Sequence, residues 1–209
     1  MIYHPRRRFA FIHIPKTGGK SINRTLMRHM GDQYEFGPTQ KMSKNLAAGV
    51  MEMVGSPAWE ETLSIALVRN PWDRAVSSYF YSRSPDAQQY DRVLAEKMHQ
   101  ITGSVNPSFE HFAAGIHANR GWHRHYHWYP QVNHLYLDGQ CLVSRIERFE
   151  KMKRAWNSIK YYAGLPERVS LPHLHKSAHT HYADYYTPAL RDAIGEVYAD
   201  DISYFGYSF

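Results

Sequence analysis

Two apolar runs, each followed by a sharp break and then an amphipathic segment, restrict this chain to a small set of folds. Residues 9–14 (Phe-Ala-Phe-Ile-His-Ile) and 63–68 (Leu-Ser-Ile-Ala-Leu-Val) are rich in β-forming side chains and predict buried strands. The segment after each run has apolar residues at helical spacing. Alternating strands and helices favour an α/β fold with a central parallel sheet flanked by helices, and ligands of such sheets bind at the carboxyl ends of the strands.

The helical segments have recognisable boundaries. Ser21 is the expected N-cap of the first helix, and Asn70 and Pro71 are the expected N-cap and first residue of the helix after the second strand. Further helices are expected over residues 42–53, 90–101, 107–116, 149–163 and from 188 onward. Residues 132–137 and 141–146 flank an Asp-Gly turn signal and predict paired strands.

The composition indicates one folded domain. The chain has 209 residues, of which 43% are hydrophobic and 14% aromatic, enough for a packed core. Because no repeat or linker interrupts it, we expect a single domain over residues 1–209, with residues 1–8 as a basic N-terminal tail. Cys141 is the single cysteine, which excludes an internal disulfide and a Cys-based zinc knuckle.

The charge balance admits several partners. The formal net charge is +6, and a positive protein suits nucleic acid, a membrane surface or a small polyanion, although solvated surface side chains explain the charge equally well. No run of 18 apolar residues is present, and no long apolar stretch follows the basic residues near the N-terminus. We therefore expect a soluble, cytoplasmic protein with no membrane segment.

Residues 13–21 (His-Ile-Pro-Lys-Thr-Gly-Gly-Lys-Ser) form the first candidate anion-binding segment. Two adjacent glycines let the backbone curl tightly and turn N–H groups inward, and the following helix adds the positive end of its dipole. The side chains that supply charge or hydroxyl donors are Lys16, Thr17, Lys20 and Ser21. A glycine-rich turn that carries surface lysines is the simpler alternative.

The spacing of this segment differs from that of the nucleotide-binding P-loop of NTPases. The pattern G-x-x-x-x-G-K-[ST] would end at Ser21 and requires glycine at position 14, where this chain has Ile14. The second strand ends in Arg69 rather than in an Asp that could hold magnesium. A nucleotide kinase or other NTPase is therefore disfavoured and stays an alternative.

Residues 69–77 (Arg-Asn-Pro-Trp-Asp-Arg-Ala-Val-Ser) form the second candidate segment. Arg69 ends a strand and Ser77 lies two turns into the next helix. A guanidinium can bind a phosphate through two hydrogen bonds, and a hydroxyl can complete the site. An arginine that caps backbone carbonyls is the simpler alternative, and Arg74 is expected to be structural in part.

Together the two segments resemble the phosphate-binding motifs of sulfotransferases. Residues 14–19 resemble their 5′-phosphosulfate loop, and residues 68–77 resemble their 3′-phosphate motif, in which Arg and Ser stand eight residues apart. Three further stretches resemble the carbohydrate branch that includes heparan 2-O- and chondroitin or dermatan sulfotransferases. These are residues 127–130 (His-Trp-Tyr-Pro), 146–150 (Ile-Glu-Arg-Phe-Glu), and 185–188 with 201–207. The resemblance spans about residues 9–209 and implies a P-loop-like nucleotide-binding sulfotransferase fold.

The resemblance also implies a reaction and a set of site residues. Sulfotransferases move a sulfuryl group, without a metal, from 3′-phosphoadenosine 5′-phosphosulfate (PAPS) to a hydroxyl or amine of an acceptor, here expected to be a carbohydrate or small molecule. Lys16 matches the catalytic lysine of the family. The implied cofactor-binding residues are Lys16, Thr17, Gly18, Gly19, Lys20, Ser21, Arg69 and Ser77, with Lys176 as a further candidate.

The general base for the acceptor proton is less clearly indicated. Several relatives have a histidine between the two phosphate motifs, where this chain has Lys41. His127 is the substitute candidate because neutral imidazole accepts protons near pH 7, and a core histidine bonded to backbone is the simpler alternative. The 14 histidines lack companions at a recognised zinc spacing, so no metal is expected.

A non-catalytic polyanion-binding protein, using the basic surface and the aromatic middle of the chain, is the remaining alternative. For the enzyme, we expect an acceptor glycan or small molecule as partner, no nucleic acid and no membrane. We also expect a monomer or a homodimer.

Overall fold

The computed structural model describes residues 1–31, 35, 46–85, 87, 92–104, 106–118, 125–172 and 180–209. The chain separates into two compact units. The sheet unit consists of Met1–Arg69 and Gln131–His175, and the helical unit consists of Asn70–Pro130 and Lys176–Phe209. The single domain expected over residues 1–209 stays a prediction.

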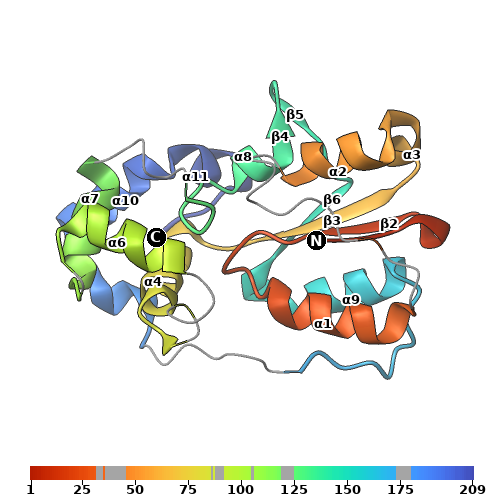
Figure 1. Cartoon of the computed structure of the whole chain (residues 1–209), viewed down its shortest axis with the longest axis horizontal. Helices are drawn as coiled ribbons and strands as arrows, with labels where there is room; N and C mark the ends of the chain where they lie inside the picture. The colour runs from red at the N-terminus through yellow and green to blue at the C-terminus, as the bar shows by residue number, and fades with distance from the viewer. Residues whose placement is uncertain are drawn as a thin grey trace. The chain divides into compact units, whose positions relative to one another are not determined.

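A four-stranded sheet in the order β1-β2-β3-β6 is the centre of the sheet unit (Figure 1). Its strands are β1 (Ile2–His4), β2 (Phe9–Ile12), β3 (Leu63–Val68) and β6 (Arg145–Arg148). β2, β3 and β6 are parallel, with Ile12 beside Ala66 and Val68 beside Arg148, so their carboxyl ends meet at one edge. The predicted α/β fold with a central, mostly parallel sheet flanked by helices is confirmed.

Helices cover both faces of this sheet (Figure 1). On one face lie α1 (Gly19–Met30) and α9 (Met152–Tyr162), and on the other lie α2 (Leu46–Val54) and α3 (Ser56–Glu60). The alternate strand residues that face α1 and α9 are large and apolar, and they form one core cluster with the buried faces of these helices. This core includes Phe9, Phe11, Ile22, Leu26, Ile65, Leu67, Trp156 and Ile159.

The first eight residues are not a tail, in contrast to the expectation from their basic character. β1 pairs antiparallel with β2, and the 3₁₀ helix η1 (Pro5–Arg7) connects the two strands. Ile2 is 1% exposed, whereas Arg6, Arg7 and Arg8 are exposed. The basic residues thus occupy the turn, and the apolar residues before them add an edge strand to the sheet.

The region around residues 132–146 also differs from the expectation. Residues 132–137 form the short helix α8 (Val132–Leu135) and then β4 (Tyr136–Leu137). The predicted strand over these residues is wrong, because the sequence of so short an apolar run does not distinguish a helix from a strand. β4 pairs with β5 (Gln140–Cys141) around the predicted turn at Asp138. The predicted strand over residues 141–146 is therefore split, and its second half belongs to β6 in the main sheet.

The helical unit packs around its own aromatic core. Its elements are α4 (Pro71–Ser82), α6 (Arg92–Thr102), α7 (Phe109–Ala118), η4 (Tyr182–Tyr185), α10 (Pro188–Val197) and α11 (Ala199–Phe205). Asn70 caps α4 as predicted, since its side chain accepts from the backbone N–H of Trp72 at 3.0 Å. The Tyr198 hydroxyl donates to the Trp128 carbonyl at 2.9 Å inside the core. Among the described residues, no helix is long and apolar enough to cross a membrane.

Candidate functional site

The loop between β2 and α1 curls through two left-handed residues. Lys16 has φ 68° and Gly18 has φ 80°. Residues that have a Cβ adopt this left-handed backbone conformation only at a cost in free energy. Thr17 lies between them and is fully buried, and its hydroxyl donates to the Ile14 carbonyl at 2.9 Å. The hydrogen bond within the loop thus stabilises its conformation. Strained backbone of the kind seen at Lys16 is commonly found at functional sites.

The two adjacent glycines are required for different reasons, Gly19 by a close contact with His13 and Gly18 mainly by its left-handed backbone. A Cβ on Gly19 would lie 1.9 Å from Cδ2 of His13, and a Cβ on Gly18 would lie 3.0 Å from Cε of Met152. Gly18, rather than the predicted Ser21, is the N-cap of α1, because its left-handed backbone turns the chain into the helix. Ser21 lies within the first turn and is 7% exposed.

The amino end of α1 is suited to an external anion. Its N-cap Gly18 has no side chain to cap it, and its first turn contains no acidic residue, although acidic residues are favoured there. Lys20 occupies that turn instead and is exposed. The first backbone N–H groups of a helix have no intrahelical partner, and together with a nearby ammonium they form a site for a phosphate-sized anion.

Arg69 connects the two sequence segments. Its side chain is largely buried, and Nη1 donates to the backbone carbonyl of Lys16 at 3.0 Å. Its guanidinium carbon lies 4.3 Å from the ring centroid of Phe149, which begins the 3₁₀ helix η3 (Phe149–Lys151) directly after β6. The three parallel strands thus deliver the glycine loop, Arg69 and Phe149 to one edge of the sheet, as the sequence predicted for the loop and Arg69.

Gln131 is a site residue that the sequence analysis missed. Its side chain is fully buried and brackets the backbone of Arg69. Oε1 accepts from the Arg69 N–H at 2.9 Å, and Nε2 donates to the Arg69 carbonyl at 2.8 Å. The available signal was its position directly after the His-Trp-Tyr-Pro stretch at residues 127–130.

His13 also has a part that the sequence analysis did not assign. Its half-buried ring rests against Gly19, and Nδ1 accepts from the Asn23 amide at 3.3 Å. Burial lowers the pKa of His13 to about 3, and the positive charges of the chain N-terminus, Lys20 and Lys16 act in the same direction. The ring is therefore neutral at physiological pH and supports the loop by packing against Gly19 without adding a charge.

Two predicted site residues, Ser77 and His127, lie in the helical unit. Ser77 is buried on α4. The ring of His127 is also buried, and it stacks on His125 with centroids 5.4 Å apart. The His127 carbonyl accepts from the Ser78 hydroxyl at 3.0 Å. The roles predicted for Ser77 and His127 stay predictions.

Arg74 has the structural part that was expected of it. It is 1% exposed, and Nη2 donates to the carbonyl of Tyr129 at 2.9 Å and to that of His127 at 3.3 Å. Lys176 and Lys41 lie outside the described residues. Within the ranges that the structure describes, no group of three or more His, Cys, Asp or Glu side chains is placed to hold a metal ion.

Comparison with known proteins identifies the family. Among solved structures, a sulfotransferase from Alicyclobacillus acidocaldarius matches with 13% identity over 94% of this chain and 92% of that chain, at a TM-score of 0.43. No curated protein matches the sequence significantly. The model of the sulfotransferase family matches residues 1–208, nearly the whole chain. The chain therefore belongs to the sulfotransferase family.

Proposed function

We propose that this protein transfers the sulfuryl group of PAPS to a hydroxyl or amine of an acceptor, which is a carbohydrate or a small molecule. The observation that carries the proposal is the hydrogen bond from Arg69 to the Lys16 carbonyl. It joins the two segments that resemble the 5′-phosphosulfate and 3′-phosphate motifs of the family. A doubly phosphorylated nucleotide that binds the glycine loop would therefore lie close to Arg69 as well.

The donor groups at this edge of the sheet fit the phosphates of PAPS. The first turn of α1 supplies backbone N–H groups, the Ser21 hydroxyl and the Lys20 ammonium for the 5′-phosphate. The Arg69 guanidinium is oriented by Phe149 and would bind the 3′-phosphate, together with Ser77 in this proposal. Lys176 is a further candidate for the nucleotide or the acceptor.

PAPS supplies the activated sulfuryl group, and the charge that develops on the leaving phosphate oxygen requires stabilisation. Lys16 is the proposed catalytic residue for this task, since it matches the catalytic lysine of the family and lies in the loop directly before α1. His127 would accept the acceptor proton as the new O–S or N–S bond forms. In this proposal, cationic side chains and backbone N–H dipoles stabilise that charge without a metal.

The test is differential stabilisation by nucleotides, measured as the melting temperature. Adenosine 3′,5′-bisphosphate at a hundred times its Kd stabilises a folded protein by about 2.7 kcal/mol. For a chain of this length that corresponds to roughly 5–10 °C. ATP with magnesium should shift the wild-type protein far less, and an equal response to both would contradict the proposal.

Variants test which residues bind the nucleotide and which residue is catalytic. Arg69→Ala should abolish most of the shift caused by adenosine 3′,5′-bisphosphate. Lys153→Ala removes an exposed cation on α9 and should leave that shift unchanged. In a screen of acceptors with labelled PAPS, Lys16→Ala should abolish transfer while the protein stays folded, and retained turnover would remove Lys16 from the mechanism.

A further inference from the structure

The His-Trp-Tyr-Pro stretch at residues 127–130 is held from α4 by two buried side chains. The Ser78 hydroxyl donates to the His127 carbonyl at 3.0 Å. Arg74 is 1% exposed, and its Nη2 donates to the Tyr129 carbonyl at 2.9 Å and to the His127 carbonyl at 3.3 Å. Within the helical unit, the backbone of this stretch is therefore fixed to α4.

The carbonyl between these two, that of Trp128, is held from a third direction. It accepts from the hydroxyl of Tyr198, a buried residue at the end of α10, at 2.9 Å. Three successive carbonyls thus accept hydrogen bonds from side chains. Satisfying a carbonyl does not require a buried guanidinium such as that of Arg74, whose desolvation is costly. We therefore ask what a stretch fixed so firmly holds in place.

Gln131, the residue that follows this stretch, holds Arg69 within the sheet unit. Its buried amide accepts from the Arg69 N–H at 2.9 Å and donates to the Arg69 carbonyl at 2.8 Å. The Cα of Arg69 lies between these two backbone groups. The amide of Gln131 therefore fixes the point from which the guanidinium side chain extends.

Residues 127–131 thus fasten both ends of the segment that we assign to the 3′-phosphate. Its first residue, Arg69, is paired with Gln131. Its last residue, Ser77, directly precedes Ser78 on α4. Neither Gln131 nor Ser78 is among the phosphate ligands of the proposed function, so their effect on a nucleotide would pass through the ligands that they hold.

We propose that Gln131 and Ser78 are positioning residues that give the nucleotide site its preference for a 3′-phosphate. This inference rests on the proposed function, because it takes Arg69 and Ser77 as the groups that contact that phosphate. The hydrogen bonds of a guanidinium to a phosphate are directional, and a binding group that moves by more than about 0.5 Å loses part of their strength. Binding of the 5′-phosphate should change little, since the Thr17 hydrogen bond also holds the glycine loop.

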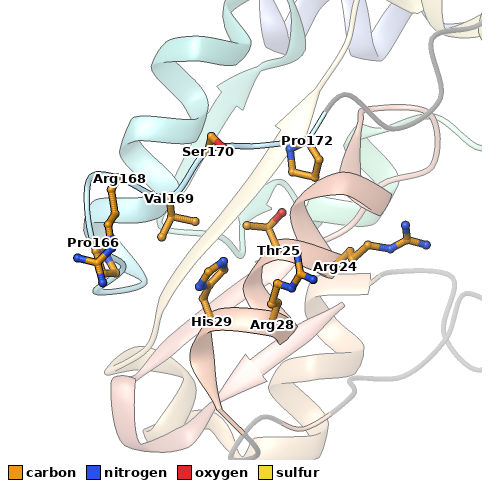
Figure 2. Close-up of a pocket in the computed structure, with 9 residues that line it drawn as sticks. All are labelled: Arg24, Thr25, Arg28, His29, Pro166, Arg168, Val169, Ser170 and Pro172. Carbon is orange, nitrogen blue, oxygen red and sulfur yellow. The ribbon is translucent and has the colours of Figure 1, made fainter.

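Another basic region of the sheet unit provides a control for charge. A pocket of about 400 Å³ between α1 and residues 166–172 is lined by Arg24 and Arg168, among others. Figure 2 shows the side chains of these two arginines pointing away from each other at opposite ends of the pocket, so they do not converge on one phosphate. Arg24→Gln therefore removes an exposed positive charge without removing an expected nucleotide contact.

The experiment compares the affinities of the full chain for adenosine 3′,5′-bisphosphate and adenosine 5′-monophosphate by calorimetry. The two nucleotides differ only in the 3′-phosphate, so the ratio of their affinities reports on that contact. The wild-type protein should bind the bisphosphate roughly tenfold or more tightly. Ser78→Ala should lower this ratio about threefold. Gln131→Met keeps the length of the side chain without its amide and should lower the ratio about tenfold.

The matched control is Ser82→Ala. Ser82 is also a buried serine of α4, but its hydroxyl donates to the Tyr79 carbonyl of the same helix at 2.7 Å. Ser82→Ala and Arg24→Gln should both leave the ratio at the wild-type level. A general loss of stability weakens the binding of both nucleotides together, so it does not change the ratio. If Gln131→Met does not fold, Ser78→Ala alone decides the outcome.

The ratios in the variants test the positioning, and the ratio in the wild-type protein tests the site itself. An unchanged ratio in the Ser78→Ala protein would overturn the inference, as would an equal fall in the Ser82→Ala protein. An equal fall in the Arg24→Gln protein would show that the ratio follows net charge, which also overturns it. If the wild-type protein bound both nucleotides equally, the 3′-phosphate site of the proposed function would fail, and this inference with it.

Discussion

Gly19→Ala tests the contact on which the phosphate-binding loop depends. The added Cβ would lie 1.9 Å from Cδ2 and 2.5 Å from Cγ of His13, far inside ordinary van der Waals contact. Cγ is attached directly to the histidine Cβ, so the ring cannot avoid the methyl group by a small rotation of its far end. Either His13 or the start of α1 must move.

The magnitude follows from two opposing effects. Overpacking of a well-filled site costs about 1–3 kcal/mol, and the higher helix propensity of alanine returns up to about 1 kcal/mol. We expect a net loss of about 1–2 kcal/mol, which lowers the melting temperature by roughly 2–8 °C for a chain of this length. Because the displaced turn carries the N–H donors, the affinity for adenosine 3′,5′-bisphosphate should fall at the same time.

A double-mutant cycle isolates the contact. In the His13→Ala background the ring is absent, so Gly19→Ala should cost about 1–3 kcal/mol less than it does in the wild-type protein. Both quantities can be measured by thermal or chemical denaturation, with nucleotide affinity from calorimetry. A Gly19→Ala protein with wild-type stability and nucleotide affinity would refute the argument, as would equal costs in the two backgrounds.

Three further predictions concern the same edge of the sheet. The pKa of His13 is about 3 in the folded protein and near 6.5 in the unfolded chain, so the unfolded state binds more protons between these values. The free energy of unfolding should therefore fall as the pH drops below 6.5, by up to about 1.4 kcal/mol per pH unit. Denaturation curves at pH 7, 5.5 and 4.5 measure this fall, which should be smaller for His13→Asn than for the wild-type protein. Gln131→Ala removes both hydrogen bonds to the Arg69 backbone and should cost about 2–4 kcal/mol in the free energy of unfolding, and a smaller loss would mean that water replaces the amide. Arg69→Lys keeps the charge but loses the contact between the guanidinium and the Phe149 ring and the paired N–H donors. Calorimetry should show at least a tenfold weaker affinity for adenosine 3′,5′-bisphosphate, and an unchanged affinity would show that charge alone suffices.

Local sequence patterns predicted the parts of the fold that depend on neighbouring residues. β2, β3, α4 and α9 lie close to where their β-forming runs and helical periodicity placed them, and the side chain of Asn70 caps α4 as its type predicts. The order of strands and helices was sufficient to predict a parallel sheet whose carboxyl ends carry the glycine loop and Arg69. These features follow from propensities and spacing, which act over a few residues.

Short elements were decided by tertiary contacts instead. Residues 2–4 form an edge strand because β2 offers an open side, and residues 132–135 form a helical turn although their composition suits a strand equally well. In such short segments the gain from packing outweighs the small differences in intrinsic propensity. The N-cap of α1 was also decided by the folded structure, since the left-handed backbone of Gly18 ends the loop before Ser21.

The composition and order of residues were thus enough to indicate which side chains could bind an anion and in which family such a chain belongs. They did not reveal that Gln131 holds the backbone of Arg69 or that His13 packs against Gly19. Each of these pairs is distant in sequence or depends on a contact of a few ångströms. Only the three-dimensional packing of strands and helices brings such groups within hydrogen-bond or van der Waals distance.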